Sequence, residues 1–235
     1  LDWVAGLYYL NEKGTDRNNL QFAIADFLSG GKVDNKSYAA FAQVTYALTD
    51  RLSLTAGGRY SHEVKSFLPD QFIVTDRTGG QLLALSRCFI SPTPTFPPNP
   101  NCVADPVLNP NGNRILPFVE LSTTANEFTS AFTADYRLTD HVLAYASYAQ
   151  GFKSGGFTQR VFPPEPVTPT FEPEHVDSYE IGLKTKLLDN RVRLNGAAFQ
   201  TDYSNLQIIV NEGVAPKVRN AAKARIKGFE LEAEV

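Results

Sequence analysis

The amino-acid sequence predicts an all-β protein, an antiparallel up-and-down meander of about eight long strands. Two observations lead to this prediction: polar and apolar residues alternate over segments of about ten residues, and tight turns alternate with long loops. A third observation excludes a helical membrane protein, because no apolar run approaches the ~18 residues of a membrane helix. With 43% hydrophobic and 20% charged residues among its 235, the chain has the composition of a folded protein.

The clearest hairpin joins residues 38–48 to residues 52–63. In its second strand Leu54 and Ala56 fall on one face with other apolar or small residues, while Arg59 falls on a polar face. The first strand alternates in the same way, and only three residues separate the two. This pattern is typical of two long strands joined by a tight turn.

Similar units recur along the chain. The predicted strands outside the first hairpin are residues 2–12, 127–138, 142–152, 175–187, 192–203 and 218–235. Their tight turns are predicted at residues 139–141 and 188–191. The strand from Val192 alternates weakly, so the sequence assigns no facing to it. The strands match the ~9–11 residues that cross a bilayer at a tilt.

The connections differ in length in a regular way. Long links are predicted over residues 13–36, 66–123, 157–174 and 204–217, and they alternate with the short turns along the chain. Outer-membrane β-barrels have this asymmetry, with short periplasmic turns and long extracellular loops. A soluble β-sandwich also alternates faces, but nothing in its physics gathers the long loops at one end.

The link over residues 66–123 is rich in proline, which supplies no hydrogen-bond donor to a sheet, so we expect no strand in its proline-rich part. The same expectation of no sheet covers the whole link, and apolar residues before the prolines favour a short helix or a folded flap. Cys88 and Cys102 both lie here and predict a disulfide, because an exported loop is an oxidising location. The alternative, a metal or redox pair, lacks a neighbouring His or a further Cys.

Other functional classes find little support. The net charge is −3 with scattered basic residues, which disfavours a nucleic-acid partner. We expect no enzyme, no catalytic residues, no metal and no cofactor, because His62, His141 and His175 lie far apart and no nucleophile elbow is present. Residues 151–156 carry a glycine-rich run that follows a strand without opening a helix. It therefore indicates a strand-to-loop transition rather than a phosphate loop.

Several motifs resemble the barrel of TonB-dependent outer-membrane receptors. They are Tyr145-Ala-Ser-Tyr-Ala-Gln-Gly-Phe-Lys-Ser-Gly-Gly-Phe157, Ser178-Tyr-Glu-Ile-Gly-Leu-Lys184, Leu188-Asp-Asn-Arg191, Ala198-Phe-Gln-Thr-Asp-Tyr203, and Arg219-Asn-Ala-Ala-Lys-Ala-Arg-Ile-Lys-Gly-Phe-Glu-Leu231. Each motif alone is weak, but their order and spacing together are specific. The resemblance covers nearly all predicted strands and fails over the long loops.

The resemblance implies a larger transmembrane barrel of about twenty-two strands, filled by an N-terminal plug. Residues 1–235 would be a partial barrel without the plug and the remaining strands, and residues 66–123 a long extracellular loop within it. The implied function is import of a scarce nutrient, most often a ferric siderophore or similar chelate. The implied location is the outer membrane of a Gram-negative bacterium, and the implied partners are its lipid, the receptor's own plug domain, TonB and the ligand. The alternative is a complete eight-stranded barrel with a structural or adhesive role.

Charged residues on the polar face are the candidate site. By alternation we expect the following side chains to face the lumen: Arg59, Glu63, Glu127, Asp135, Arg137, Lys153, Glu180, Lys184 and Glu230. One interpretation is that they hold the plug or face water. The other is that those near the outer rim, such as Lys153 and Glu63, touch the ligand, while Asp135, Arg137 and Lys184 face the plug.

Overall fold

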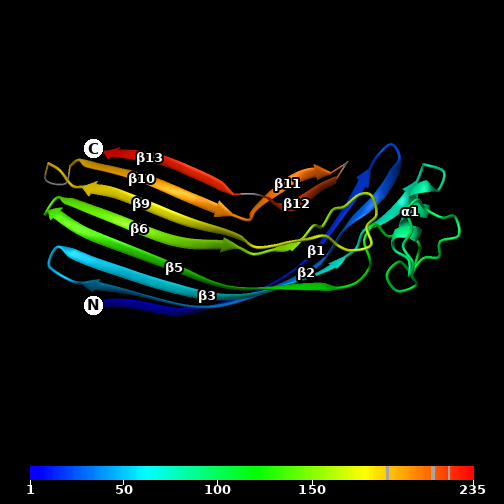
Figure 1. Ribbon diagram of the computed structural model, residues 1–235, viewed down its shortest axis with the longest axis horizontal. Coiled ribbons are helices and arrows are strands. Elements are labelled where there is room, and N and C mark those ends of the chain that lie inside the picture. The colour runs from blue at the N-terminus through cyan, green and yellow to red at the C-terminus, as the bar shows by residue number, and fades with distance from the viewer. Residues whose placement is uncertain (189–190, 213–214, 222) are drawn as a thin grey trace.

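Eight long antiparallel strands form the body of the protein in a computed structural model (Figure 1). The structure describes residues 1–188, 191–212, 215–221 and 223–235. The strands are β1 (Asp2–Gln21), β2 (Ala25–Ala47), β3 (Leu52–Pro69), β5 (Leu121–Thr139), β6 (Val142–Lys153), β9 (Glu174–Thr185), β10 (Arg193–Ser204) and β13 (Ala224–Glu234). They pair in the order β1-β2-β3-β5-β6-β9-β10-β13, so each pairs with its neighbour in the meander. This confirms the predicted fold class.

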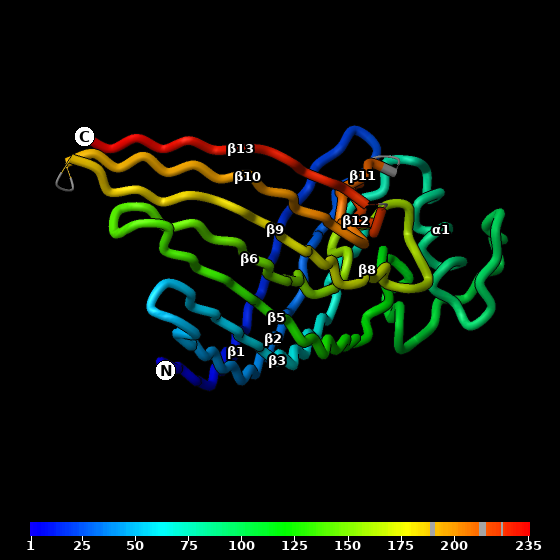
Figure 2. The backbone as a smooth tube through the Cα atoms, turned by 60° about the vertical axis from the view of Figure 1, so that its left-hand side comes forward, coloured from blue at the N-terminus to red at the C-terminus, as the bar shows by residue number. Residues whose placement is uncertain are grey.

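The sheet is curved but open (Figure 2). In the described part of the chain, β1 pairs only with β2, and β13 pairs only with β10. Strands β1 and β13 therefore form the opposite edges of the sheet. A closed eight-stranded barrel requires β1 to pair with β13. The alternative of a complete small barrel is therefore wrong, and the sheet is part of a larger barrel.

Tight turns gather at one end of the sheet, as predicted. The hydroxyl of Thr49 accepts hydrogen bonds from the N–H groups of Arg51 (3.2 Å) and Leu52 (3.0 Å). In the next turn the hydroxyl of Thr139 accepts one from the N–H of His141 (3.2 Å). Threonine thus closes both turns by binding nearby backbone. The third predicted turn includes Asp189 and Asn190, which lie outside the described residues.

Two of the predicted long loops are wrong in their extent. Residues 13–36 belong to β1 and β2, whose pairing continues from Asp2↔Thr45 to Gln21↔Asp26. Within the predicted loop 204–217 and the start of the predicted strand 218–235, two short strands pair with each other, β11 (Leu206–Glu212) and β12 (Ala215–Ala221). The loop end of β2 lacks a clean apolar face because protein covers both of its faces, as the burial of the neighbouring residues Phe27 and Leu28 shows.

The predicted loop over residues 66–123 is also too wide, because β3 continues to Pro69 and β5 begins at Leu121. The connection between them, residues 70–120, folds at the loop end into a unit that we call the cap. The expectation of no sheet in this link is wrong at its start, because β4 (Phe72–Asp76), which precedes the prolines, pairs with β2. Helix α1 (Gln81–Phe89) follows, in agreement with the expected short helix. The proline-rich part after α1 contains no strand until β5 begins. Cys88 and Cys102 are joined by a disulfide. No helix within the described ranges has the length and apolar character to cross a membrane.

The loops around the cap share a small apolar core. Phe27 of β2, Ile73 of β4 and Leu82 of α1 pack with Ile115, Leu116 and Val161, and each of these side chains is buried. Val161 belongs to the connection between β6 and β9, which also contains the short strands β7 (Gly156–Phe157) and β8 (Thr170–Phe171). The core therefore ties the cap to a second loop and to the tip of the β1–β2 hairpin.

A seam opens in the wall between β5 and β6. Their pairing ends at Ala131↔Ala149, while β5 continues to pair with β3 as far as Phe67↔Leu121. Beyond the seam the chain after β6 crosses toward β3, because Lys65 Nζ donates to the Gly155 carbonyl (3.2 Å). The rings of Phe67 and Phe157 stack with centroids 5.9 Å apart. The β6–β9 loop thus lies over the face of the sheet that carries Lys65 and Phe67.

Candidate binding site at the loop end

The strand register places the charged candidates on one face of the sheet. Asp135 of β5 pairs with Tyr145, which lies opposite Gly182, and this row continues through Ala197 to Glu230. The remaining candidates lie on the same face in rows above or below it: Arg59, Glu63, Glu127, Arg137, Lys153, Glu180 and Lys184. They do not form one cluster, since Arg137 and Lys184 lie near the tight turns and Glu63 and Lys153 near the loops.

Toward the turn end of this face the structure brings two candidates together around Tyr145. The Tyr145 hydroxyl donates a 2.5 Å hydrogen bond to the Glu180 carboxylate, and Lys184 Nζ lies 4.9 Å from the centre of the ring. The ring lies against Gly182, where a Cβ would be only 2.6 Å from it. Glycine is therefore required at this position for the close approach of the ring.

Other candidates pair toward the loops. Glu127 of β5 pairs with His175 of β9 at 3.1 Å, and this contact links the two strands on the loop side of the seam between β5 and β6. Arg59 Nε donates to the Ser61 hydroxyl (3.0 Å), and its guanidinium lies 5.2 Å from the centre of the Tyr8 ring. Lys153 and Lys65 both line a cavity of about 380 Å³ between the wall and the β7–β8 and β11–β12 loops.

The opposite face is apolar and exposed. Leu7, Phe229 and Leu231 are 89%, 80% and 83% exposed, although each lies well inside a strand. Contiguous exposed apolar surface of this kind requires an apolar neighbour. Toward the loop end this face carries the rings of Tyr148 and Tyr179, which contact each other in a tilted arrangement with centroids 5.1 Å apart. Amphipathic rings in such a row are typical of a membrane interface.

The β11–β12 hairpin is fastened over the inner face by two amide side chains. Gln207 Nε2 donates to the carbonyls of Ser154 (3.1 Å) and Glu172 (3.0 Å). Asn220 accepts from the Glu172 N–H (2.7 Å) and donates back to the Glu172 carbonyl (2.9 Å). Because backbone groups are obligatory hydrogen-bonding partners, these amides fix the hairpin against the β6–β9 loop.

Glu165 joins three loops at one point. Its N–H donates to the Ile115 carbonyl of the cap (2.9 Å), and its carboxylate pairs with Lys217 Nζ of β12. The Lys217 side chain is only 10% exposed, so little water competes for its charge. The cap, the β6–β9 loop and the β11–β12 hairpin are thus fixed relative to one another.

Two carboxylates hold the base of the cap. Arg77 hydrogen-bonds Asp26 through both of its terminal nitrogens (3.0 and 2.6 Å), and this contact holds the pKa of Asp26 below its usual range. Burial raises the pKa of Asp76, but hydrogen bonds from Thr78 and from the first turn of α1 outweigh it, so that pKa is also lowered. The Leu83 N–H of that turn donates to Asp76 at 3.1 Å.

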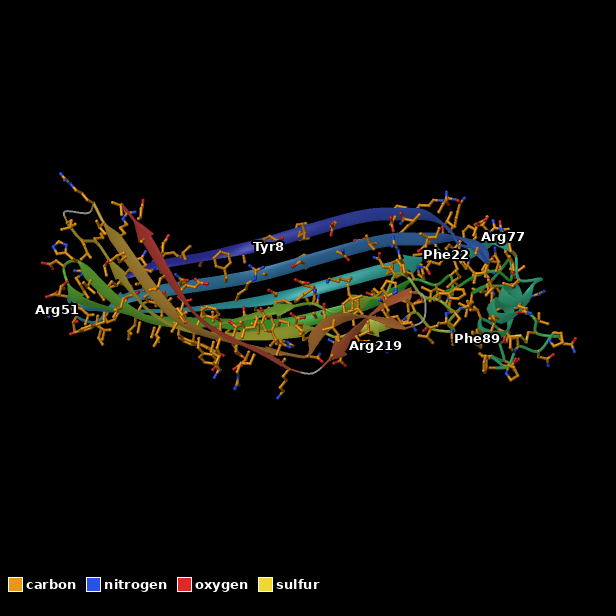
Figure 3. The ribbon with its side chains drawn as sticks, turned by 90° about the horizontal axis from the view of Figure 1, so that it is seen from above. Tyr8, Phe22, Arg51, Arg77, Phe89 and Arg219 are labelled. Carbon is orange, nitrogen blue, oxygen red and sulfur yellow. A yellow bond between two sulfur atoms is a disulfide. The ribbon has the colours of Figure 1, made fainter. Side chains whose placement is uncertain are left out.

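An apolar cavity of about 450 Å³ lies where these loops meet. Three phenylalanines line it: Phe22 between β1 and β2, Phe27 of β2, and Phe162 of the β6–β9 loop. Figure 3 shows Phe22 and Arg77 at the loop end, opposite Arg51 at the turn end. Ser29 and Gln71 supply its polar floor, and Arg160 contributes a cationic group to its lining. This volume falls within the ~300–1,000 Å³ usual for small-molecule sites.

Sequence reasoning missed these loop residues. Phe22 and Phe27 lie in a segment expected to be an open loop, and Glu165 and Lys217 lie in different predicted loops. The one available signal is composition, since the tip of the first hairpin carries aromatic residues between polar ones. Among the residues that the structure describes, no three His, Cys, Asp or Glu side chains are grouped to hold a metal ion.

Known proteins resemble the chain over its whole length. The pesticin receptor of Yersinia pestis is 25% identical over 242 residues, which cover 100% of this chain and 29% of that receptor. The fold matches the ferric yersiniabactin uptake receptor of Yersinia pestis with a TM-score of 0.71 and 23% identity, over 99% of this chain and 29% of that one. It matches the closed ferric-catecholate import receptor of E. coli K12 with a TM-score of 0.63 and 17% identity, over 99% and 32%.

The chain therefore spans about 29% of the length of the curated relatives that it matches. Residues 1–235 match the family described as "TonB dependent receptor-like, beta-barrel". The open meander, its apolar outer face and its folded loops at one end agree with that match. The chain belongs to the TonB-dependent receptor β-barrel family.

Proposed function

We propose that this chain forms part of the wall and outer mouth of an outer-membrane receptor that imports a scarce nutrient, a ferric siderophore or a similar chelate. The observation that carries the proposal is the arrangement of the loops. Tight turns close one end of the sheet, while at the other end three loops fold over the inner face and are fastened there by Gln207, Asn220 and Glu165. A wall with a structural role alone does not need such a built mouth.

The relatives support the same class of ligand. Two of the matching structures are named as receptors for ferric yersiniabactin and for ferric catecholates, and both cover nearly all of this chain. In this proposal the charged face looks into the lumen and contacts a plug, while the apolar face contacts outer-membrane lipid. TonB would supply the energy for import through the plug rather than through these strands.

Uptake of radioactive iron in a Gram-negative host tests the proposal. Cells that express the full receptor containing this chain take up iron-55 from one or more ferric chelates, and deleting either the receptor or TonB abolishes that uptake. Cells with the receptor but without TonB serve as the matched control. Equal uptake with and without the receptor, across catecholate, hydroxamate, carboxylate and mixed-type chelates, would contradict iron import.

A further inference from the structure

The apolar cavity at the loop end is enclosed on several sides by different segments. The hairpin tip supplies Phe22, β2 supplies Phe27, the β6–β9 loop supplies Phe162, and β12 supplies Ala215. The contacts of Glu165 with Ile115 and Lys217 fix the β6–β9 loop to β12 and to the cap, which supplies Ile115 to the lining. The cavity is therefore built into the fold and does not need a ligand to bring its walls together.

Aromatic rings give the cavity a specific surface. The ring of Phe27 makes edge contacts with Phe22 and with Phe162, at centroid distances of 5.7 and 5.4 Å. The three rings form one continuous aromatic wall of the cavity, and such a wall favours an aromatic or flat unsaturated ring, which can stack on it or meet it edge to face. A flexible, strongly hydrated ligand would lose its water here without gaining hydrogen bonds.

The polar groups of the cavity are few and differ in availability. Gln71 and Ser29 are buried and bonded to each other at 3.0 Å, so they offer little to a ligand. Arg160 is exposed, and within the described residues no carboxylate pairs with its guanidinium. An unpaired cation beside an apolar cavity favours an anionic group on the apolar ligand, since guanidinium binds carboxylate-like groups through paired hydrogen bonds.

We propose that this cavity binds a ring-bearing organic anion, with its ring among Phe22, Phe27 and Phe162 and its negative group on Arg160. This inference rests on the proposed import function and narrows it. The ligand presented to this part of the mouth is an apolar chelate with an aromatic or similar flat ring and an acidic substituent. A highly hydrated chelate without such a ring does not fit the cavity.

Two probes of the same shape separate the roles of ring and charge. Naphthalene-1-sulfonate carries the anion, and naphthalene-1-sulfonamide is its neutral counterpart. Equilibrium dialysis measures their binding to the full receptor in lipid nanodiscs, after subtraction of empty nanodiscs. We expect the sulfonate to bind the natural receptor about tenfold more tightly than the sulfonamide, the ratio of one charge-assisted contact.

Three variants localise the site. Arg160→Gln should weaken the sulfonate about tenfold and leave the sulfonamide unchanged. Phe162→Ala should weaken both probes, and Phe162→Leu keeps an apolar side chain should the alanine variant fail to fold. Arg51→Gln, a matched charge loss in the turn at the opposite end, should change neither. Equal sulfonate binding by the natural and Arg160→Gln receptors overturns the anion assignment, and no binding above empty nanodiscs overturns the cavity as a site.

Failure of this inference is distinct from failure of the import proposal. Receptor-dependent iron uptake without binding of either probe would refute the cavity as a binding site and leave the import proposal standing. Binding of both probes that depends on Phe162 and Arg160, without any TonB-dependent uptake, would support the binding site and refute the import proposal.

Discussion

The Glu165 carboxylate pairs with Lys217 Nζ across 52 residues of sequence, and the N–H of the same glutamate binds the Ile115 carbonyl. Both side chains are largely shielded from water, at 26% and 10% exposure. A charge left behind in such a place loses its partner without regaining full hydration. This single residue therefore holds together three loops that form the outer mouth.

Replacing Glu165 with Gln should loosen the β11–β12 hairpin. We expect a local loss of stability of about 1–3 kcal/mol, because Lys217 keeps its charge and loses an anionic partner. Hydrogen exchange of β12 in the full receptor measures the effect. Lys13→Met is the control, since the Lys13–Asp34 pair is exposed and such pairs contribute about 1 kcal/mol or less. Unchanged exchange in β12 would show that Glu165 does not fix the hairpin.

The base of the cap should open in acid. The pKa values of Asp26 and Asp76 are lowered in the folded protein, so the unfolded cap binds more protons in acid than the folded cap. Their stabilising contacts are complete above the unfolded pKa of about 4, and they are lost as the pH falls through the lower folded values. Hydrogen exchange of β4 and α1, corrected for its intrinsic pH dependence, should rise below about pH 4.

The variant Asp76→Asn tests the cause of that opening. It removes the carboxylate that accepts the Leu83 N–H, so the cap should exchange faster at pH 7 and show a smaller change in acid. Asp50→Asn, in a tight turn at the other end of the sheet, is the matched control. An acid-induced opening of equal size in all three proteins would assign it to other groups.

Loss of the disulfide should destabilise the cap alone. Replacing Cys88 and Cys102 with Ser frees a loop with a sequence separation of 14, and closing such a loop is worth about 3 kcal/mol in the chain-entropy account. We expect faster hydrogen exchange in α1 and unchanged exchange in β9 and β10. The natural receptor treated with a reductant provides an independent comparison. Protection of α1 that survives both treatments would contradict the prediction.

Substitution by Arg on the two faces should separate lipid from lumen. Ala56 and Ala134 lie on the apolar face, where an Arg near the middle of the bilayer should cost about 2–4 kcal/mol. Thr55 and Thr133 pair with each other on the charged face, so Arg there should cost much less. Outer-membrane assembly of the four variants, scored by heat-modifiable migration, measures the difference. Equal assembly of all four variants would contradict contact of the apolar face with lipid. Failure of the Thr variants with assembly of the Ala variants would show that the charged face is the one that contacts lipid.

Much of the sheet could be predicted from sequence because its two faces differ in polarity, one apolar and one charged, as the proposed lipid and lumen sides require. The alternation of Leu54 and Ala56 with Thr55 records that difference, and a slip of one residue would reverse it. Beyond the bilayer both faces meet water or protein, so the alternation stops although the strands continue to Gln21 and Pro69. The alternation alone therefore predicts strand ends that are several residues too early.

The mouth could not be predicted in the same way. Phe22, Phe162 and Ala215 meet only because separate loops fold over one another, and no local period relates them. Glu165 and Lys217 are ordinary charged loop residues until burial makes their pairing necessary. Such contacts depend on tertiary packing, on which the spacing of residues in one segment carries no information.

The seam between β5 and β6 sets a limit on the height of the membrane. Above Ala131 and Ala149 these strands no longer pair with each other, so their facing backbone groups must find water or side chains. Hydrocarbon offers neither, and a wall with such an opening is stable only outside the lipid core. The rings of Phe132 and Tyr148, 6.4 Å apart just below the opening, lie where the headgroups then begin. In the proposed receptor, the end of the β5–β6 pairing therefore sets the highest level that the hydrocarbon of the outer leaflet can reach on this side of the barrel.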